Sequence, residues 1–232
     1  HTPTRRQRQM CIRDSSIPAQ KVFEIIKNEE WSVFLNSNSK QYPDQRFDIL
    51  SASPKQKIIF SDDSTYLINE DQQPKKSELC PFELLKKVMS EYKSHSDPDI
   101  PFSGGAIGYI SYDFGNYLHK IDNKNSCLNH PLFAFGIYDW AVIYDYAQEK
   151  SFLLYHEKNN ITENIINNYQ QNIKSNLIPF QLTSRCESNM NYDLYEMKIL
   201  KILEYIRAGD CYQVNLSQMF SLSYEGDEYE LY

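Results

Sequence analysis

The order of predicted secondary-structure elements constrains the fold of this 232-residue chain more than any single motif. Short apolar or alternating stretches predict strands at 47–52, 57–60, 65–68, 106–112, 133–146, 151–156 and 180–184. Helical periodicity predicts helices at 19–28, 81–92 and 160–175, and another after Asn191. Strands therefore occur in runs, without the regular strand–helix alternation of a parallel α/β sheet. The pattern predicts an α+β fold with mostly antiparallel sheets and flanking helices.

The strongest local pattern lies near the end of the chain. Asn191 is placed to cap a helix whose apolar residues recur at helical spacing, and Gly209 suits the position after its last turn. Alternation beyond Gly209 predicts a strand that runs to Tyr224. Gln213 and Asn215 share one face of this strand, where they hold neighbouring strands together or touch a ligand.

Charge and cysteine content exclude several classes of function. The chain has 24 basic and 31 acidic residues, a net charge of -7, whereas a nucleic-acid-binding protein needs a basic face. Its five cysteines include no C-x-x-C pair, which argues against a zinc site or a disulfide framework. No apolar run approaches the ~18 residues that span a bilayer, and no signal-peptide pattern is visible. We expect a cytoplasmic protein with no nucleic-acid or membrane partner.

The first residues do not match the rest of the chain. Residues 1–15 show neither helical nor strand periodicity. Met10–Ser15 also resembles the translation of a sequencing-library adapter. We therefore expect 1–15 to be a non-native or disordered tail that lies outside the fold.

No familiar catalytic motif is present. The segment from Gly104 to Gly108 matches neither a P-loop nor a dinucleotide-binding fingerprint, so we expect a tight bend or a close backbone approach in a sheet. The histidines show no metal-ligand spacing, and no nucleophile elbow occurs. Trp140 is expected in the core, whereas Asp139 either caps the turn into its strand or serves a site.

A set of segments, in the order found in one enzyme family, carries the functional signal. They are Arg46–Pro54 (RFDILSASP), Pro101–Asp113 (PFSGGAIGYISYD), Gly136–Ala141 (GIYDWA), Ser188–Met190 (SNM) and Gly209–Ser217 (GDCYQVNLS). Together they resemble component I of aminodeoxychorismate synthase, one of the chorismate-utilising enzymes. Anthranilate synthase component I, the close relative, usually has Leu-Leu-Glu-Ser and a QVVLS-like strand. This chain has Phe34–Ser37 (FLNS) and Gln213–Ser217 (QVNLS) instead, which favours aminodeoxychorismate synthase.

The resemblance implies a domain organisation and a reaction. Residues 16–184 correspond to the N-terminal domain of component I, and 185–232 to the start of the chorismate-binding domain. The family replaces the 4-hydroxyl of chorismate by ammonia from a glutamine amidotransferase subunit, giving a folate precursor, 4-amino-4-deoxychorismate. Magnesium and the catalytic residues belong to the C-terminal half, beyond Tyr232. This chain alone is therefore expected to be inactive, with no catalytic residue or metal ligand of its own.

The resemblance also implies a tryptophan pocket in the N-terminal half. The corresponding residues are Ser37, Asp44, Gln45, Arg46 and Phe47, of which Ser37 and Arg46 match the family and Asp44 and Gln45 correspond by position only. A polar surface loop is the competing interpretation of this segment. The whole chain is also consistent with an anthranilate synthase component I, a tryptophan-binding module, or a module that only docks the amidotransferase.

Overall fold

The structure is a computed structural model that describes the chain in separate stretches. They are residues 11–37, 45–70, 72–92, 99–121, 130–169 and 178–231. The chain divides into two compact units, His1–Lys174 and Ser175–Tyr232. Every strand pair in the described stretches is antiparallel, which confirms the predicted α+β class. Within the same stretches, no helix has the length and apolar character needed to cross a bilayer.

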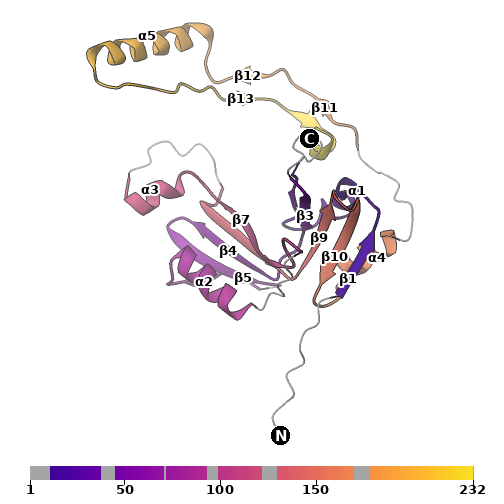
Figure 1. Ribbon diagram of the computed structural model, residues 1–232. Helices are drawn as coiled ribbons and strands as arrows, with labels where there is room; N and C mark the ends of the chain where they lie inside the picture. The colour runs from indigo at the N-terminus through magenta and orange to yellow at the C-terminus, as the bar shows by residue number, and fades with distance from the viewer. Residues whose placement is uncertain are drawn as a thin grey trace. The chain divides into compact units, whose positions relative to one another are not determined.

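The first unit contains a five-stranded sheet with helices on one face (Figure 1). Its strand order is β1 (Cys11–Ser15), β10 (Lys150–Tyr155), β9 (Trp140–Asp145), β3 (Phe47–Ser51) and β2 (Val33–Leu35). Helices α1 (Ala19–Ile26) and α4 (Asn160–Tyr169) pack on the same apolar cluster. The apolar stripe of α1 includes Val22 and Ile26, which are buried in this cluster with Trp140. Trp140 is therefore a core residue, as predicted.

A second five-stranded sheet completes the first unit. Its order is β6 (Lys75–Ser77), β5 (Ser64–Asn69), β4 (Gln56–Ser61), β8 (Phe133–Tyr138) and β7 (Gly105–Ile110). Helix α2 (Pro81–Glu91) covers one face and buries Leu84 and Val88 against Ile58 (Figure 1). The helical stripe predicted for 81–92 is thus confirmed, whereas α3 (Phe114–His119) has no counterpart among the predicted elements.

The two sheets share an almost continuous stretch of backbone. Asp139 alone separates β8 from β9, although these strands belong to different sheets. The prediction of one strand over 133–146 is therefore wrong, whereas its hairpin with 151–156 is confirmed by the pairing of β9 with β10. Almost all of β9 is buried, so no change in alternation marks the break in the sequence.

The second unit consists of short strand pairs and one long helix. Strand β11 (Gln181–Leu182) pairs with β14 (Tyr224–Glu225), β12 (Glu187–Ser188) pairs with β13 (Phe220–Ser221), and helix α5 spans Tyr192–Ala208. A single 3-10 turn, η1, follows at Glu228–Glu230. The predicted cap is confirmed, because the Asn191 side chain accepts a hydrogen bond from the Leu194 N–H at 2.9 Å. Gly209 ends α5 with a φ of 83°, the left-handed conformation that glycine favours.

The strand predicted between Gly209 and Tyr224 is mostly absent. Only β13 and the first residue of β14 are extended and paired, and 211–219 lies outside any strand. A strand requires a neighbouring backbone for its hydrogen bonds, and no described strand pairs with 211–219. Gln213 and Asn215 are consequently exposed rather than buried on a sheet face.

The structure bears on the expected tail and on the division of the chain into units. Residues 11–15 form β1, which pairs along β10 from Cys11 opposite Tyr155 to Ser15 opposite Ser151, so this part of the expected tail lies within the sheet. Backbone pairing at a sheet edge does not require alternating side chains, which explains why the pattern gave no signal. The compact units divide at 174/175, because β11 pairs with β14, and the domain boundary expected at 184/185 stays a prediction.

Candidate functional site

A buried carboxylate organises the start of β3. Asp48 is 0% exposed, and its Oδ1 accepts hydrogen bonds from the Ser37 N–H at 2.8 Å and the Ser37 hydroxyl at 3.0 Å. Its Oδ2 accepts a hydrogen bond from the Tyr146 hydroxyl at 2.9 Å. The antiparallel register of β2 with β3 places Leu35 opposite Ile49, so the chain leaving β2 runs alongside Asp48. These donors satisfy a charge that would otherwise be costly to bury.

A second carboxylate, at the end of β9, holds Arg46. The Arg46 Nε and one terminal nitrogen donate to Asp145 Oδ1 at 2.9 Å and Oδ2 at 2.5 Å, a bidentate pair. The Ala147 N–H and the Gln148 amide also donate to Asp145, which is 1% exposed. The hydrogen bond from Arg46 is the main cause that lowers the pKa of Asp145 below its usual range. The Arg46 guanidinium lies 4.6 Å from the centre of the Phe47 ring.

The pair predicts a pH-dependent loss of stability in Arg46→Ala. Because the pKa of Asp145 is lowered in the fold, its contribution is present above the ordinary aspartate pKa and lost as pH falls through the folded value. Arg46→Ala should therefore melt at a lower temperature than wild type at pH 7, and this gap should close on acidification. Circular dichroism melts from pH 3 to pH 7 measure it. Lys150→Ala, which breaks only the exposed ion pair with Asp14, is the control; equal gaps for both variants would contradict the prediction.

Alternation along β3 sends neighbouring side chains to opposite faces of the first sheet. Phe47 and Ile49 pack with Ile100 and Phe102 in a cluster separate from the one beneath α1. The charge of Asp99 acts on Arg46 in addition to its hydrogen bond with Asp145. The start of the Pro101–Asp113 segment therefore lies against the start of the Arg46–Pro54 segment.

The structure brings most of the predicted tryptophan-site residues to one end of the β2–β3 ladder. Ser37 is half-buried on Asp48, Phe47 is half-buried beneath the half-exposed Arg46, and Gln45 is exposed. Asp44 lies outside the described residues. The resemblance did not indicate Asp48, although a signal was available. An aspartate inside the apolar run Phe-Asp-Ile-Leu must be paired when the strand is buried.

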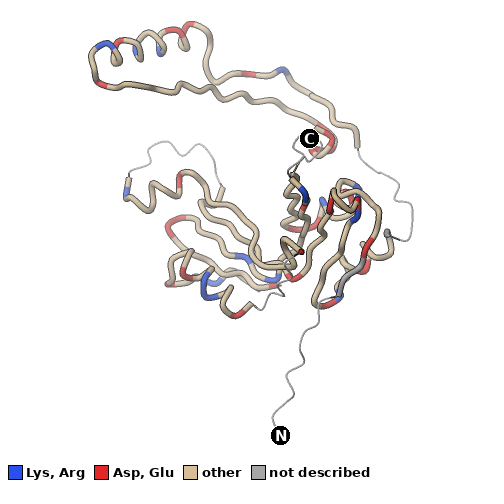
Figure 2. Tube along the Cα trace, in the orientation of Figure 1, with Lys and Arg blue, Asp and Glu red and all other residues tan. Residues whose placement is uncertain are grey.

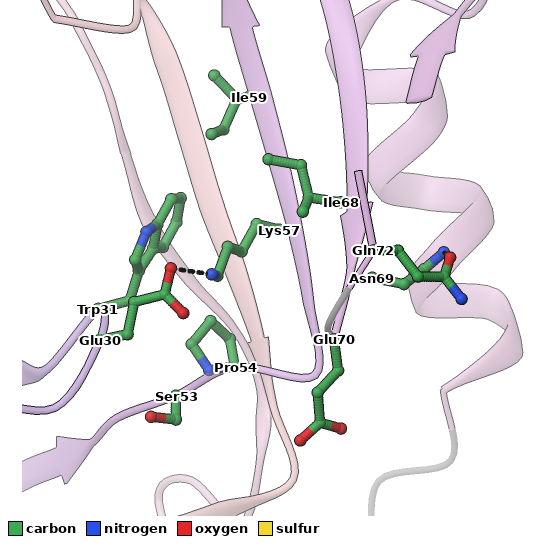
Figure 3. Close-up of a pocket in the computed structure, with 10 residues that line it drawn as sticks. All are labelled: Glu30, Trp31, Ser53, Pro54, Lys57, Ile59, Ile68, Asn69, Glu70 and Gln72. Atoms are coloured by element: carbon green, nitrogen blue, oxygen red, sulfur yellow. Dashed lines mark hydrogen bonds and ion pairs between the residues drawn. The ribbon is translucent and has the colours of Figure 1, made fainter. Parts of the chain in front are cut away.

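A pocket of about 570 Å³ lies at the opposite end of the same ladder (Figure 3). Its lining comprises Glu30, Trp31, Ser53, Pro54, Lys57, Ile59, Ile68, Asn69, Glu70 and Gln72. Trp31 and Ser53 have positive φ values of 53° and 48°, which are uncommon for residues other than glycine. The Trp31 carbonyl accepts a hydrogen bond from Tyr138 at 2.9 Å, and burial raises the pKa of this phenol.

The charged residues of this pocket are paired with one another or with a close neighbour. Lys57 forms an ion pair with Glu30, drawn as a dashed line in Figure 3, and its ammonium lies 5.7 Å from the centre of the Trp31 ring. Glu70 pairs with Lys55 at 3.0 Å. The pocket therefore has an apolar surface between charged side chains that are all ion-paired. Elsewhere along the trace, basic and acidic residues are interspersed (Figure 2).

Asp139 lies at the junction between the two sheets of the first unit. Its carboxylate lies 3.9 Å from the Lys55 ammonium, and its carbonyl accepts the His156 N–H at 3.4 Å. Burial raises its pKa, against the opposing effect of Lys55. In the described part of the chain, no group of three His, Cys, Asp or Glu side chains could hold a metal ion.

Comparison with known proteins shows the fold and the family of this chain. A solved structure of anthranilate synthase component I from Streptococcus pneumoniae TIGR4 superposes with a TM-score of 0.57 at 22% identity, covering 88% of this chain and 46% of that one. At this identity the likeness establishes the fold. The family model described as chorismate binding enzyme matches residues 33–232, and the chain belongs to this family.

The curated relatives include aminodeoxychorismate synthases and an anthranilate synthase. Aminodeoxychorismate synthase component 1 of Escherichia coli (strain K12) is 32% identical over 219 residues, covering 92% of this chain and 47% of the relative. The protein of the same description from Salmonella typhimurium is 31% identical over 225 residues, with the same coverage of 92% and 47%. Anthranilate synthase component 1 of Lactococcus lactis is 28% identical, covering 86% of this chain and 46% of the relative. The chain spans about half the length of these relatives.

Proposed function

We propose that this chain is the N-terminal part of an aminodeoxychorismate synthase component I. The protein would bind chorismate and replace its 4-hydroxyl by ammonia, releasing water and 4-amino-4-deoxychorismate. The observation that carries the proposal is the 32% identity to a curated aminodeoxychorismate synthase component 1 across 92% of the chain. A glutamine amidotransferase subunit would supply the ammonia, as the resemblance implies.

Magnesium is assigned to the parent protein rather than to the residues described. Its ligands would be carboxylates of the parent's C-terminal half, as the resemblance implies. When bound there, the ion would polarise and orient chorismate. The residues described instead form a scaffold and a candidate amino-acid site.

Tryptophan would bind at the Ser37 and Arg46 end of the β2–β3 ladder, where the resemblance implies its site. Asp145 occupies Nε and one terminal nitrogen of the half-exposed Arg46, which leaves further N–H groups that can donate to a carboxylate. Phe47 offers an aromatic edge beside the guanidinium. Asp48 and Asp145 are buried and hold Ser37 and Arg46 by hydrogen bonds, so these two side chains would be oriented before a ligand arrives.

Anthranilate synthesis is the second candidate, supported by the 28% identity to a curated anthranilate synthase component 1. The two reactions differ in the position at which chorismate is aminated and in whether the side chain of chorismate is eliminated. Asn36 occupies the place where that family usually has glutamate, which favours the aminodeoxychorismate product.

Product analysis tests the proposal. The protein made from a gene extended to the length of its relatives should convert chorismate to 4-amino-4-deoxychorismate when glutamine, Mg²⁺ and an amidotransferase subunit are present. Chromatography identifies the product. The 232-residue chain under the same conditions should give no product above the uncatalysed background. Anthranilate, detected by its fluorescence, as the main product of the extended protein would overturn the proposal in favour of the second candidate.

A further inference from the structure

The pocket of Figure 3 contains an indole whose backbone has an uncommon conformation. Trp31 and Ser53, in the turns that precede β2 and follow β3, have φ values of 53° and 48°. A left-handed conformation is unfavourable for a bulky residue and persists where neighbouring groups fix it. Here the Tyr138 hydroxyl donates to the Trp31 carbonyl at 2.9 Å, and the Ser53 N–H donates to the Glu30 carbonyl at 2.7 Å. Such fixed, unfavourable turns are typical of ligand-binding sites.

The lining of the pocket suits a flat apolar group. Ile59 of β4 and Ile68 of β5 are half-buried, and Pro54 borders the same space (Figure 3). The volume of about 570 Å³ falls in the range of small-molecule sites, ~300–1,000 Å³. An aromatic ring packs favourably against an indole and against aliphatic side chains. The pocket therefore has the room and the surface for such a ring.

Lys57 brings a positive charge to this apolar surface. In its ion pair with Glu30, the lysine side chain is 14% exposed and the glutamate side chain 66%. The Lys57 ammonium lies 5.7 Å from the centre of the Trp31 ring, a cation–π contact that does not depend on Glu30. Glu70, the other acidic residue of the lining, is paired with Lys55 at 3.0 Å. An incoming carboxylate can therefore replace the exposed Glu30 on an ammonium that is already held in place.

We propose that this pocket binds a small aromatic carboxylate, with its ring against the apolar lining and its carboxylate on the Lys57 ammonium. Glu30 is then a competitor, whose side chain pairs with Lys57 in the free protein and moves into solvent when the ligand binds. The pocket lies at the end of the β2–β3 ladder opposite Ser37 and Arg46. The inference is therefore independent of the tryptophan site and of the reaction proposed above.

Benzoate and benzamide test the proposal, because they share a ring and differ in charge. Trp31 and Trp140 are the two tryptophans of the chain, so in Trp140→Phe the tryptophan fluorescence comes from the pocket alone. Titration of this 232-residue variant with benzoate should change the emission until it saturates. Benzamide should bind about 10-fold more weakly, the order expected for one hydrogen bond to a charged group.

Two further substitutions, made in the Trp140→Phe chain, should move the affinity in opposite directions. Lys57→Met keeps an aliphatic side chain and removes the ammonium, so benzoate should bind as weakly as benzamide. Glu30→Gln removes the competing carboxylate and should tighten benzoate binding about 2- to 5-fold, the range of an exposed ion pair. Lys150→Met is the matched control: it removes an ion-paired lysine that does not line the pocket and should leave both affinities unchanged.

Each outcome bears on the proposal. Equal affinities for benzoate and benzamide, or undiminished benzoate binding in Lys57→Met, would overturn the carboxylate site. Absence of a saturable change with benzoate would overturn it as well. Benzoate binding that is no tighter in Glu30→Gln would overturn the competing role of Glu30, and a loss of folding cannot imitate the gain expected there. A loss in Lys150→Met as large as in Lys57→Met would show a general effect of charge and contradict a specific site.

Discussion

Replacing Trp140 by alanine is expected to lower the free energy of unfolding of the first unit by about 3–5 kcal/mol. Trp140 is 0% exposed and packs in the cluster that joins the first sheet to α1 and α4. Removing the indole leaves a large cavity that the surrounding strands and helices can only partly fill. Urea denaturation followed by far-ultraviolet circular dichroism measures the change without using tryptophan fluorescence.

Trp140→Phe is the control for this prediction. It keeps an aromatic ring in the cluster, and it removes an indole N–H that has no hydrogen-bond partner among the described residues. An unsatisfied buried donor is itself unfavourable, so its removal offsets part of the lost packing. The phenylalanine variant should retain most of the wild-type stability. An alanine variant as stable as the phenylalanine one would show that Trp140 does not fill the core.

Gly108→Ala is expected to destabilise the second sheet by about 3 kcal/mol, the upper part of the range for overpacking. A Cβ atom at this position would lie 2.0 Å from the Ala134 carbonyl oxygen and 2.6 Å from the Phe135 Cα. Both are backbone atoms of β8, the partner of β7, so a rotamer change cannot relieve the clash. The close backbone approach expected for this glycine is confirmed.

Gly115→Ala is the matched control for Gly108→Ala. Gly115 lies in α3, and an added Cβ would meet no atom within 4 Å. Alanine also favours a helix over glycine, so this variant should be as stable as wild type or up to about 1 kcal/mol more stable. Thermal and urea melts of the two variants, compared under one buffer condition, test the pair. Equal effects of the two substitutions would contradict the close approach of β7 to β8.

Sequence patterns predicted α1, α2, α4 and α5 but not α3, because the predicted helices carry local signals. The stripe of α2 and the capped ends of α5 are local properties, set by residues a few positions apart. The failures concern strands, whose existence depends on partners distant in the sequence. The overpredicted strand after Gly209 alternates correctly but has no described partner over 211–219, whereas β1 lacks alternation but has the edge of β10.

The candidate site shows the same division. Ser37, Arg46 and Phe47 were identified from their place in family-like segments, and the structure gathers them at one end of β2 and β3. The contact between Arg46 and Asp145 joins residues 99 positions apart, which no local pattern could indicate. Only the tertiary pairing of β3 with β9 creates it.

The single residue between β8 and β9 restricts which changes of chain length the family can accept here. Adding or deleting one residue at Asp139 would exchange the two faces of β9, because side chains alternate along a strand. Trp140 and Val142 would then leave the cluster beneath α1 and α4, and Ala141 and Ile143 would take their places. Insertions and deletions should therefore be absent at this position in related sequences, while substitutions of Asp139 itself leave the register intact. The fold therefore constrains the length of this junction more strictly than the identity of its one residue.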